Sequence, residues 1–177
     1  MADIGCGLGS STLLMARAFQ NSRFDGFDIH APSIEEASMR AAGHDGAANA
    51  NFEARSAKET PANGYDLVCM FDCLHDMGDP VGAARRIREC LADDGTLMLV
   101  EPMAGDTLSD NLNPLGQLFY AASTLICTPA SKDQEVGLAL GAQAGEARLT
   151  AVLREAGFTR IRRASETPTN MVLEARP

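Results

Sequence analysis

The chain has 177 residues, of which 45% are hydrophobic and 22% charged, as is typical of one compact domain with a full core. Its 24 acidic residues outnumber the 15 Lys and Arg, and the formal net charge of -9 argues against nucleic acid or an anionic lipid surface as a partner. The longest apolar stretch, 118–127, is far shorter than the ~20 residues that a membrane span needs. We therefore expect neither a membrane protein nor a nucleic-acid-binding protein.

The cysteines and the start of the chain indicate the compartment. No basic or apolar segment of a secretory signal precedes Asp3, which predicts a cytoplasmic protein. The odd number of cysteines and the lack of a CxxC pair argue against a disulfide framework and against a four-ligand zinc site. We expect reduced, mostly buried thiols and no bound metal at Cys6, Cys69, Cys73, Cys90 and Cys127.

The first hundred residues alternate short apolar runs with helical patterns, as in a parallel sheet that carries helices on both faces. The run YDLVCMF is almost continuously apolar, as expected of a strand that is buried on both faces. This rhythm predicts an α/β fold with a doubly wound, Rossmann-like sheet. The predicted strands are 1–4, 24–28, 51–54, 65–71 and 96–101, and the predicted helices are 10–19, 32–43 and 80–91.

Residues 103–144 break this rhythm with Asn-Pro, Thr-Pro and several glycines around an apolar helix predicted at 115–126. An insertion of this length is often a lid. After a helix at 146–156, strands at 159–164 and 170–175 are joined by a short loop, which predicts an antiparallel pair at the sheet edge. We expect one domain, 1–177, with a mostly parallel sheet and a lid-like insertion.

The loop DIGCGLG at residues 3–9 is the strongest functional signal, because glycines between a strand and a helix let the backbone approach a ligand closely. Ser10 stands where a dinucleotide-binding GxGxxG loop requires Gly or Ala. Asp3, before the glycines, can receive an ammonium group, and Asp28, after the second strand, can accept hydrogen bonds from ribose hydroxyls. Together they describe a site for a cationic amino acid joined to a nucleoside.

With these motifs the sequence resembles the class I S-adenosylmethionine-dependent methyltransferases. ADIGCGLGSST is similar to their first motif, FDIH to the ribose-binding acid, and ARSAKE to the turn beside adenine. YDLVCMFDCLHDMGDP and GTLMLVEP resemble their fourth and fifth strands. The resemblance implies S-adenosyl-L-methionine as cofactor, bound by Asp3, Gly5, Cys6, Gly7, Asp28, Ile29, Ser56, Ala57, Phe71 and Asp72.

The resemblance also suggests a base for the chemistry. His75 follows the fourth strand in CLHDM, which looks like the LHDW-type motif of small-molecule O-methyltransferases, whose histidine is the general base. Met77 stands in place of the tryptophan. Glu101, at the end of the fifth strand, can orient the imidazole. Many methyltransferases of other substrate classes carry a histidine here without using it as a base, so catalytic and structural roles for His75 both stay open.

Other polar and apolar residues have two interpretations each. Asp76 and Asp79 either bind a metal or, as we expect, cap the following helix. His30 follows the ribose acid, and His44 is expected to be solvated near a helix end. An apolar acceptor pocket or simple core packing would account for Met77, Met103, Phe119 and Tyr120. A solvated face is the expected setting of Arg154, Arg160, Arg162 and Arg163.

Members of the family that are most like this chain carry an upstream helix and an N-terminal winged-helix-like domain. We therefore expect a catalytic portion whose sheet is truncated at its first strand, with a homodimer forming through the missing domain. The expected activity is methyl transfer to a hydroxyl of a small molecule. The alternatives are a cofactor-binding remnant without catalysis and an NAD-dependent oxidoreductase, which Ser10 and Asp3 disfavour.

Overall fold

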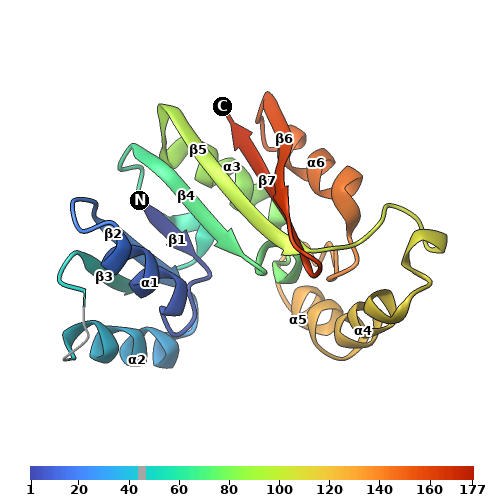
Figure 1. The fold of residues 1–177 in the computed structure, drawn as a ribbon, viewed down its shortest axis with the longest axis horizontal. Coiled ribbons are helices and arrows are strands. Elements are labelled where there is room, and N and C mark those ends of the chain that lie inside the picture. Colours follow the sequence, from blue (N-terminus) through green and yellow to red (C-terminus); the bar gives the residue numbers. More distant parts are fainter. Residues whose placement is uncertain (44–46) are drawn as a thin grey trace.

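The computed structural model of the protein describes residues 1–43 and 47–177. In them a sheet of seven strands has the order β3-β2-β1-β4-β5-β7-β6 (Figure 1). The first five strands pair in parallel, and the last two run antiparallel at one edge, which confirms the predicted doubly wound sheet. The strands are β1 (Ala2–Ile4), β2 (Phe24–Asp28), β3 (Ala50–Ala54), β4 (Tyr65–Phe71), β5 (Leu91–Pro102), β6 (Arg160–Glu166) and β7 (Asn170–Arg176).

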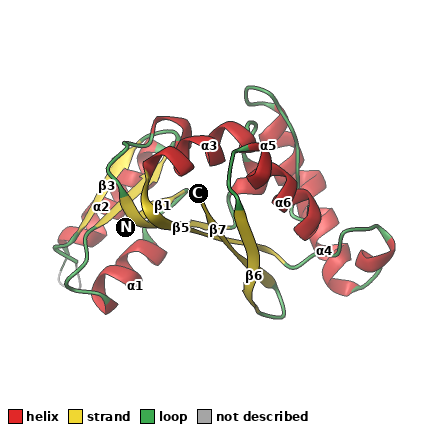
Figure 2. Ribbon diagram, turned by 90° about the horizontal axis from the view of Figure 1, so that it is seen from above, coloured by secondary structure: helices red, strands yellow, loops and turns green. Residues whose placement is uncertain are grey.

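Helices cover both faces of the sheet. Figure 2 shows α1 (Ser10–Ala18) on one face and α3 (Pro80–Cys90) with α6 (Gly145–Glu155) on the opposite face, while α2 (Ala31–Ala42) connects β2 with β3. The larger core cluster lies between α3, α6 and the sheet, where Ile87 and Leu149 pack with Leu99. Asp79 accepts a hydrogen bond from the Gly82 N–H at 2.8 Å, so this carboxylate caps α3 as expected.

The fifth strand begins earlier than predicted. β5 begins at Leu91, whereas the sequence predicted a strand that begins at residue 96. The register between β4 and β5 shifts there, so that Tyr65 pairs with Leu91 and Leu67 with Thr96. A Cβ at Gly95 would lie 2.7 Å from the Tyr65 carbonyl oxygen. A Cβ at Gly95 would also lie 3.0 Å from the Ala92 backbone, so residues 92–95 form a tight irregularity between two paired parts of β5.

The insertion holds several short helices in place of one. They are η3 (Ser109–Asn111), α4 (Pro114–Ala122), a π-helical turn η4 (Ser123–Cys127) and α5 (Thr128–Lys132). Figure 1 shows α4 and α5 beyond the carboxyl end of β5. Large apolar side chains such as Leu118 and Leu125 are exposed on this segment. Within the described residues, no helix is both long and apolar enough to cross a membrane.

Candidate active site

The glycine loop turns the chain from β1 into α1 at the carboxyl end of the sheet. Gly5, Gly7 and Gly9 have φ values of 71°, 52° and 72°, in the left-handed region that favours glycine. A Cβ on Gly5 would lie 2.8 Å from Cys73, whereas nothing lies within 4 Å of a Cβ built on Gly7. The loop is therefore closely packed on one side and open on the other.

Asp28 holds this loop against the end of β2. Its Oδ2 accepts a hydrogen bond from the Gly7 N–H at 2.9 Å, and its Oδ1 accepts one from the His30 N–H at 2.9 Å. Each carboxylate oxygen keeps a free lone pair after these bonds. Asp28 also lines the adjacent cavity, so the same group stabilises the loop and faces the ligand space.

A cavity of about 270 Å³ opens beside the loop. Of the residues predicted to bind the cofactor, the cavity is lined by Gly5, Asp28, Ile29, Ser56 and Ala57. Further lining residues escaped the sequence analysis: Arg55 and Lys58, next to the predicted pair, and Gln134 and Glu135, from the insertion. The first two lie inside the ARSAKE motif on either side of the predicted pair, but no local signal connects residues 134–135 with the glycine loop.

The remaining predicted cofactor residues, Asp3, Cys6, Gly7, Phe71 and Asp72, do not line this cavity. Asp3 is buried beneath α1, where its Oδ2 accepts hydrogen bonds of 2.6 Å from the hydroxyls of Ser11 and Thr12. Its Oδ1 is buried without a hydrogen-bond partner. Burial raises the pKa of Asp3, although the two hydroxyls oppose that shift. Asp3 therefore supports the start of α1 and keeps one acceptor unused.

Asp72 lies at the end of β4, with φ 48° in the left-handed region. It accepts a 2.8 Å hydrogen bond from Asn170 Nδ2, which ties it to β7. Burial raises the pKa of Asp72. The neighbouring Phe71 and the loop residue Cys6 are half-buried and buried, respectively. None of these three residues lines the cavity.

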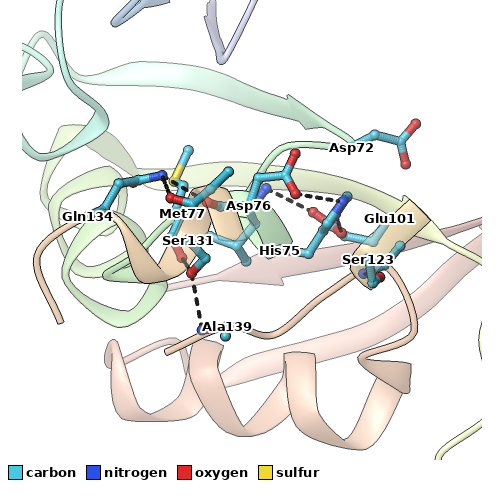
Figure 3. A network of polar contacts seen from close by, with 12 residues as sticks. Asp72, His75, Asp76, Met77, Glu101, Ser123, Ser131, Gln134 and Ala139 are labelled. Carbon is cyan, nitrogen blue, oxygen red and sulfur yellow. Dashed lines mark hydrogen bonds and ion pairs between the residues drawn. The ribbon is translucent and has the colours of Figure 1, made fainter. Parts of the chain in front are cut away.

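His75 and Glu101 form a buried polar pair near the cavity. His75 lies on the 3-10 helix η2 (Leu74–Asp76) and is only 4% exposed, and Glu101, near the end of β5, is 1% exposed. Glu101 Oε2 lies 2.5 Å from His75 Nδ1, and its Oε1 accepts a 3.0 Å hydrogen bond from the Leu74 N–H. Figure 3 shows the imidazole between Glu101 and Asp76.

The second imidazole nitrogen lies next to the Asp76 carboxylate. His75 Nε2 lies 3.3 Å from Asp76 Oδ1. The cavity is lined by Asp76 and Met77 but not by His75 itself. Burial lowers the pKa of His75, but the hydrogen bond to Glu101 and the charges of Glu101, Asp76 and Asp72 outweigh it, so the pKa is raised above its ordinary value.

Residues 131–141, which we call the strap, pack against the loop that follows η2. The Ser131 hydroxyl donates to the Met77 carbonyl oxygen at 2.8 Å, and the Gly78 N–H donates to Gln134 Oε1 at 3.0 Å. Glu135 forms a 2.6 Å ion pair with Lys58. The strap thus brings part of the insertion to the cavity wall.

Several candidates lie elsewhere. His30 is exposed, with its Nδ1 2.8 Å from the Ser33 hydroxyl, and His44 lies outside the described residues. Of the proposed apolar pocket residues, only Met77 lines the cavity, and Met103 packs against the core. Two of the C-terminal arginines form ion pairs: Arg162 with Glu174, and Arg163 with Glu146 and Glu166.

The doubly wound sheet, the glycine loop after β1 and the acid after β2 define a nucleoside-binding α/β domain. Its family follows from comparison with known proteins. The family model described as methyltransferase domain matches residues 2–97, more than half of the chain. The chain therefore belongs to the class I S-adenosylmethionine-dependent methyltransferases, which removes the oxidoreductase alternative.

Named relatives support this assignment. A trans-aconitate 2-methyltransferase from Streptomyces avermitilis is 30% identical over 113 residues, covering 63% of this chain and 42% of that protein. The polyketide synthase ThaQ from Burkholderia thailandensis is 32% identical over 104 residues, covering 58% of this chain and 5% of that protein. The chain spans less than half the length of the curated relatives that it matches.

Solved structures share the fold along the whole chain. The mitomycin 7-O-methyltransferase MmcR has 25% sequence identity and a TM-score of 0.73, covering 99% of this chain and 48% of that one. Human N-acetylserotonin methyltransferase, solved with S-adenosylmethionine, has 20% identity and a TM-score of 0.73, covering 99% of this chain and 46% of that one. Because its sequence identity is only 20%, the human enzyme shows a shared fold and nothing more specific.

The residues present fit the cofactor of this family, S-adenosyl-L-methionine. The open side of Gly7 leaves room that a side chain would fill. Asp28 offers a carboxylate to the cavity, and its free lone pairs suit the ribose hydroxyls of this cofactor. Asp3 is buried beneath α1 and does not line the cavity, so it supports the loop from below.

Proposed function

We propose that this chain transfers a methyl group from S-adenosyl-L-methionine to a hydroxyl of a small molecule. The observation that carries the proposal is the buried Glu101–His75 pair next to the cofactor cavity. The bound cofactor supplies a methyl group on a sulfonium, which is already activated for displacement. The chain then has to align the acceptor and remove its proton.

The cofactor is held by the residues around the cavity. Asp28 would accept hydrogen bonds from the ribose hydroxyls, and Ser56 and Ala57 would hold the adenine. Gly5 and the open side of Gly7 leave space for the methionine part. Asp3 acts by fixing the first turn of α1 under the loop, because its Oδ2 is already bonded to Ser11 and Thr12.

His75 acts as the general base. Glu101 accepts a hydrogen bond from Nδ1–H, which selects the tautomer whose Nε2 has a free lone pair. Nε2 lies 3.3 Å from Asp76 Oδ1, and Asp76 lines the cavity, so one side chain separates the imidazole from the cavity. Glu101 is a positioning residue, since it acts through the imidazole.

The charged groups near His75 indicate which class of methyl acceptor the site favours. Glu101, Asp76 and Asp72 are the charged groups that raise the pKa of His75, and all three are acidic. A carboxylate acceptor would meet their repulsion, whereas a neutral hydroxyl would not. The site therefore favours an uncharged hydroxylated acceptor over a polycarboxylate, although trans-aconitate methyltransferases are among the relatives.

A second function is favoured by one observation: His75 is only 4% exposed and does not line the cavity. A chain whose imidazole stayed sequestered would bind the cofactor without methylating anything. This alternative predicts binding of S-adenosylhomocysteine but no turnover with any acceptor.

The test combines binding with turnover. Calorimetry should show S-adenosylhomocysteine binding, and a panel of uncharged phenols should include an acceptor that is methylated. His75→Gln, which keeps a hydrogen-bond partner for Glu101, should lower kcat about 10² to 10⁴-fold and leave cofactor affinity unchanged. The control is His30→Ala, because His30 is exposed and outside the cavity. Equal turnover for His75→Gln and the wild type would refute the base assignment.

The pH dependence gives a further prediction. The base must be neutral, so the rate falls as the pH drops through the pKa of His75, which lies above the ordinary value for histidine. The groups that face His75 are Glu101, Asp76, Asp72 and the Cys127 thiol. Asp76→Asn removes a nearby negative charge and should move this limb of kcat/KM to lower pH. A limb that stays in place, in rate profiles measured with EDTA present, would contradict the assignment.

A further inference from the structure

Three different metal-ligating groups meet beside the cavity. His75, Asp76 and Cys127 each offer one atom, and these atoms all lie within 4.8 Å of one another. We propose that His75 Nε2, Asp76 Oδ1 and Cys127 Sγ form a binding site for a thiophilic divalent cation of the zinc class. Binding of the cation at this site does not require methyltransferase activity.

The separation of the first two ligand atoms suits such a cation. His75 Nε2 and Asp76 Oδ1 are 3.3 Å apart. Zinc–nitrogen and zinc–oxygen bonds of about 2.0–2.1 Å at the tetrahedral angle place two ligand atoms about 3.3 Å apart. The Asp76 Oδ1 atom is buried without a hydrogen-bond partner. A cation between the two atoms would give this oxygen a partner at bonding distance.

The imidazole is already oriented for metal binding. Metal-ligating histidines usually donate their other N–H to a carboxylate, which fixes the ring and raises its basicity as a ligand. Glu101 Oε2 lies 2.5 Å from His75 Nδ1, and the Leu74 N–H holds the other Glu101 oxygen at 3.0 Å. Figure 3 shows this arrangement, with Glu101 and Asp76 on either side of the ring.

The third ligand comes from the insertion. Cys127 is buried at the end of the π-helical turn η4, and π-helical turns often occur at functional sites. A thiolate with an imidazole and a carboxylate favours zinc over the hard ions magnesium and calcium. The sulfur lies within 4.8 Å of both other ligand atoms. Three protein ligands leave a fourth position open, and Asp76 borders the cavity from which the ion would enter.

One consequence rests on the proposed function. A cation on His75 Nε2 occupies the lone pair that would accept the proton of the methyl acceptor. Bound zinc and general-base catalysis by His75 therefore exclude each other, and zinc should inhibit methyl transfer by the wild-type chain.

The test is direct measurement of metal binding to the full chain after treatment with EDTA. Calorimetry with zinc chloride should give one site per chain. Cobalt(II) should give a tetrahedral spectrum with a thiolate charge-transfer band. Cys127→Ser should remove that band and weaken zinc binding by more than the ~10 to 100-fold typical of changes outside the ligand shell. Asp76→Asn should weaken binding in the same direction.

The matched control is Cys90→Ser, because Cys90 donates to the Thr60 carbonyl oxygen at 3.2 Å, a bond that serine can keep. This variant should bind zinc like the wild type. Equal affinity for the wild type and Cys127→Ser, or no binding by the wild type, would overturn the proposal. Because binding is measured without turnover, a chain that methylates no acceptor can still confirm the metal site, and a failed metal site leaves the methyltransferase proposal intact.

Discussion

Asp28 illustrates how one side chain serves both the loop and the ligand space. Its two oxygens hold the N–H groups of Gly7 and His30, both at 2.9 Å, so the carboxylate is fixed before any ligand binds. Preorganisation of this kind lowers the entropy that binding costs. The residue therefore matters both for its charge and for the shape of the loop.

We predict that Asp28→Asn weakens S-adenosylhomocysteine binding by about 1–3 kcal/mol, because the ribose hydroxyls lose a charged acceptor. Calorimetry measures the difference. Asp25→Asn is the control, since Asp25 lies on the same strand but accepts its hydrogen bond from the Tyr65 hydroxyl. Unchanged affinity in Asp28→Asn would remove this carboxylate from the cofactor site.

The insertion has two parts, which differ in how firmly they are packed against the rest of the fold. The strap is hydrogen-bonded to the loop after η2 and reaches the cavity wall through Gln134 and Glu135. The earlier part, around α4, exposes Leu118 and Leu112, which are 61% and 76% accessible. Few buried apolar contacts mean low local stability, so the two parts should open at different rates.

We predict that α4 amides exchange hydrogen faster than strap amides, and that the strap slows further when S-adenosylhomocysteine binds. Exchange followed by mass spectrometry on the full chain measures both effects. Glu135→Gln should reduce the protection of the strap, because its ion pair with Lys58 is lost. Slow exchange throughout residues 103–144 without ligand would mean that the insertion is ordinary core and no lid.

At the scale of the whole molecule, the described chain buries two apolar clusters, a larger one against α3 and α6 and a smaller one under α1. The cavity lies where the loop after β1 and the ends of β2 and β4 meet, so a bound ligand contacts elements on both sides of the sheet centre. Ligand binding should therefore stabilise the fold as a unit.

S-adenosylhomocysteine at about 100 times its Kd should add about 2.7 kcal/mol of stability. For a chain of this size that corresponds to a rise in Tm of about 5–11 °C. NAD at the same concentration should give no rise. Thermal unfolding followed by circular dichroism measures this, and equal shifts with both ligands would contradict the cofactor assignment.

The local pattern of the sequence was enough to predict the strands, most helices and the glycine loop. Hydrophobic periodicity and glycine spacing depend on neighbours within a few residues, so YDLVCMF and DIGCGLG carry their structure with them. The π-helical turn, the early start of β5 and the division of the insertion were not predicted. Each depends on pairing or packing with a distant segment.

The motifs of the sequence were sufficient to predict the family and the segments that build its site. Which side chains meet there follows from the packing of distant segments in the fold. Asp3 turned toward Ser11 and Thr12, while residues 134–135 joined the cavity across more than a hundred positions from the glycine loop. Cys127 reached His75 in the same way. The last two contacts join residues that are far apart in the sequence, and they depend on how the chain returns to the sheet after the insertion. Local residue spacing does not encode that long-range packing.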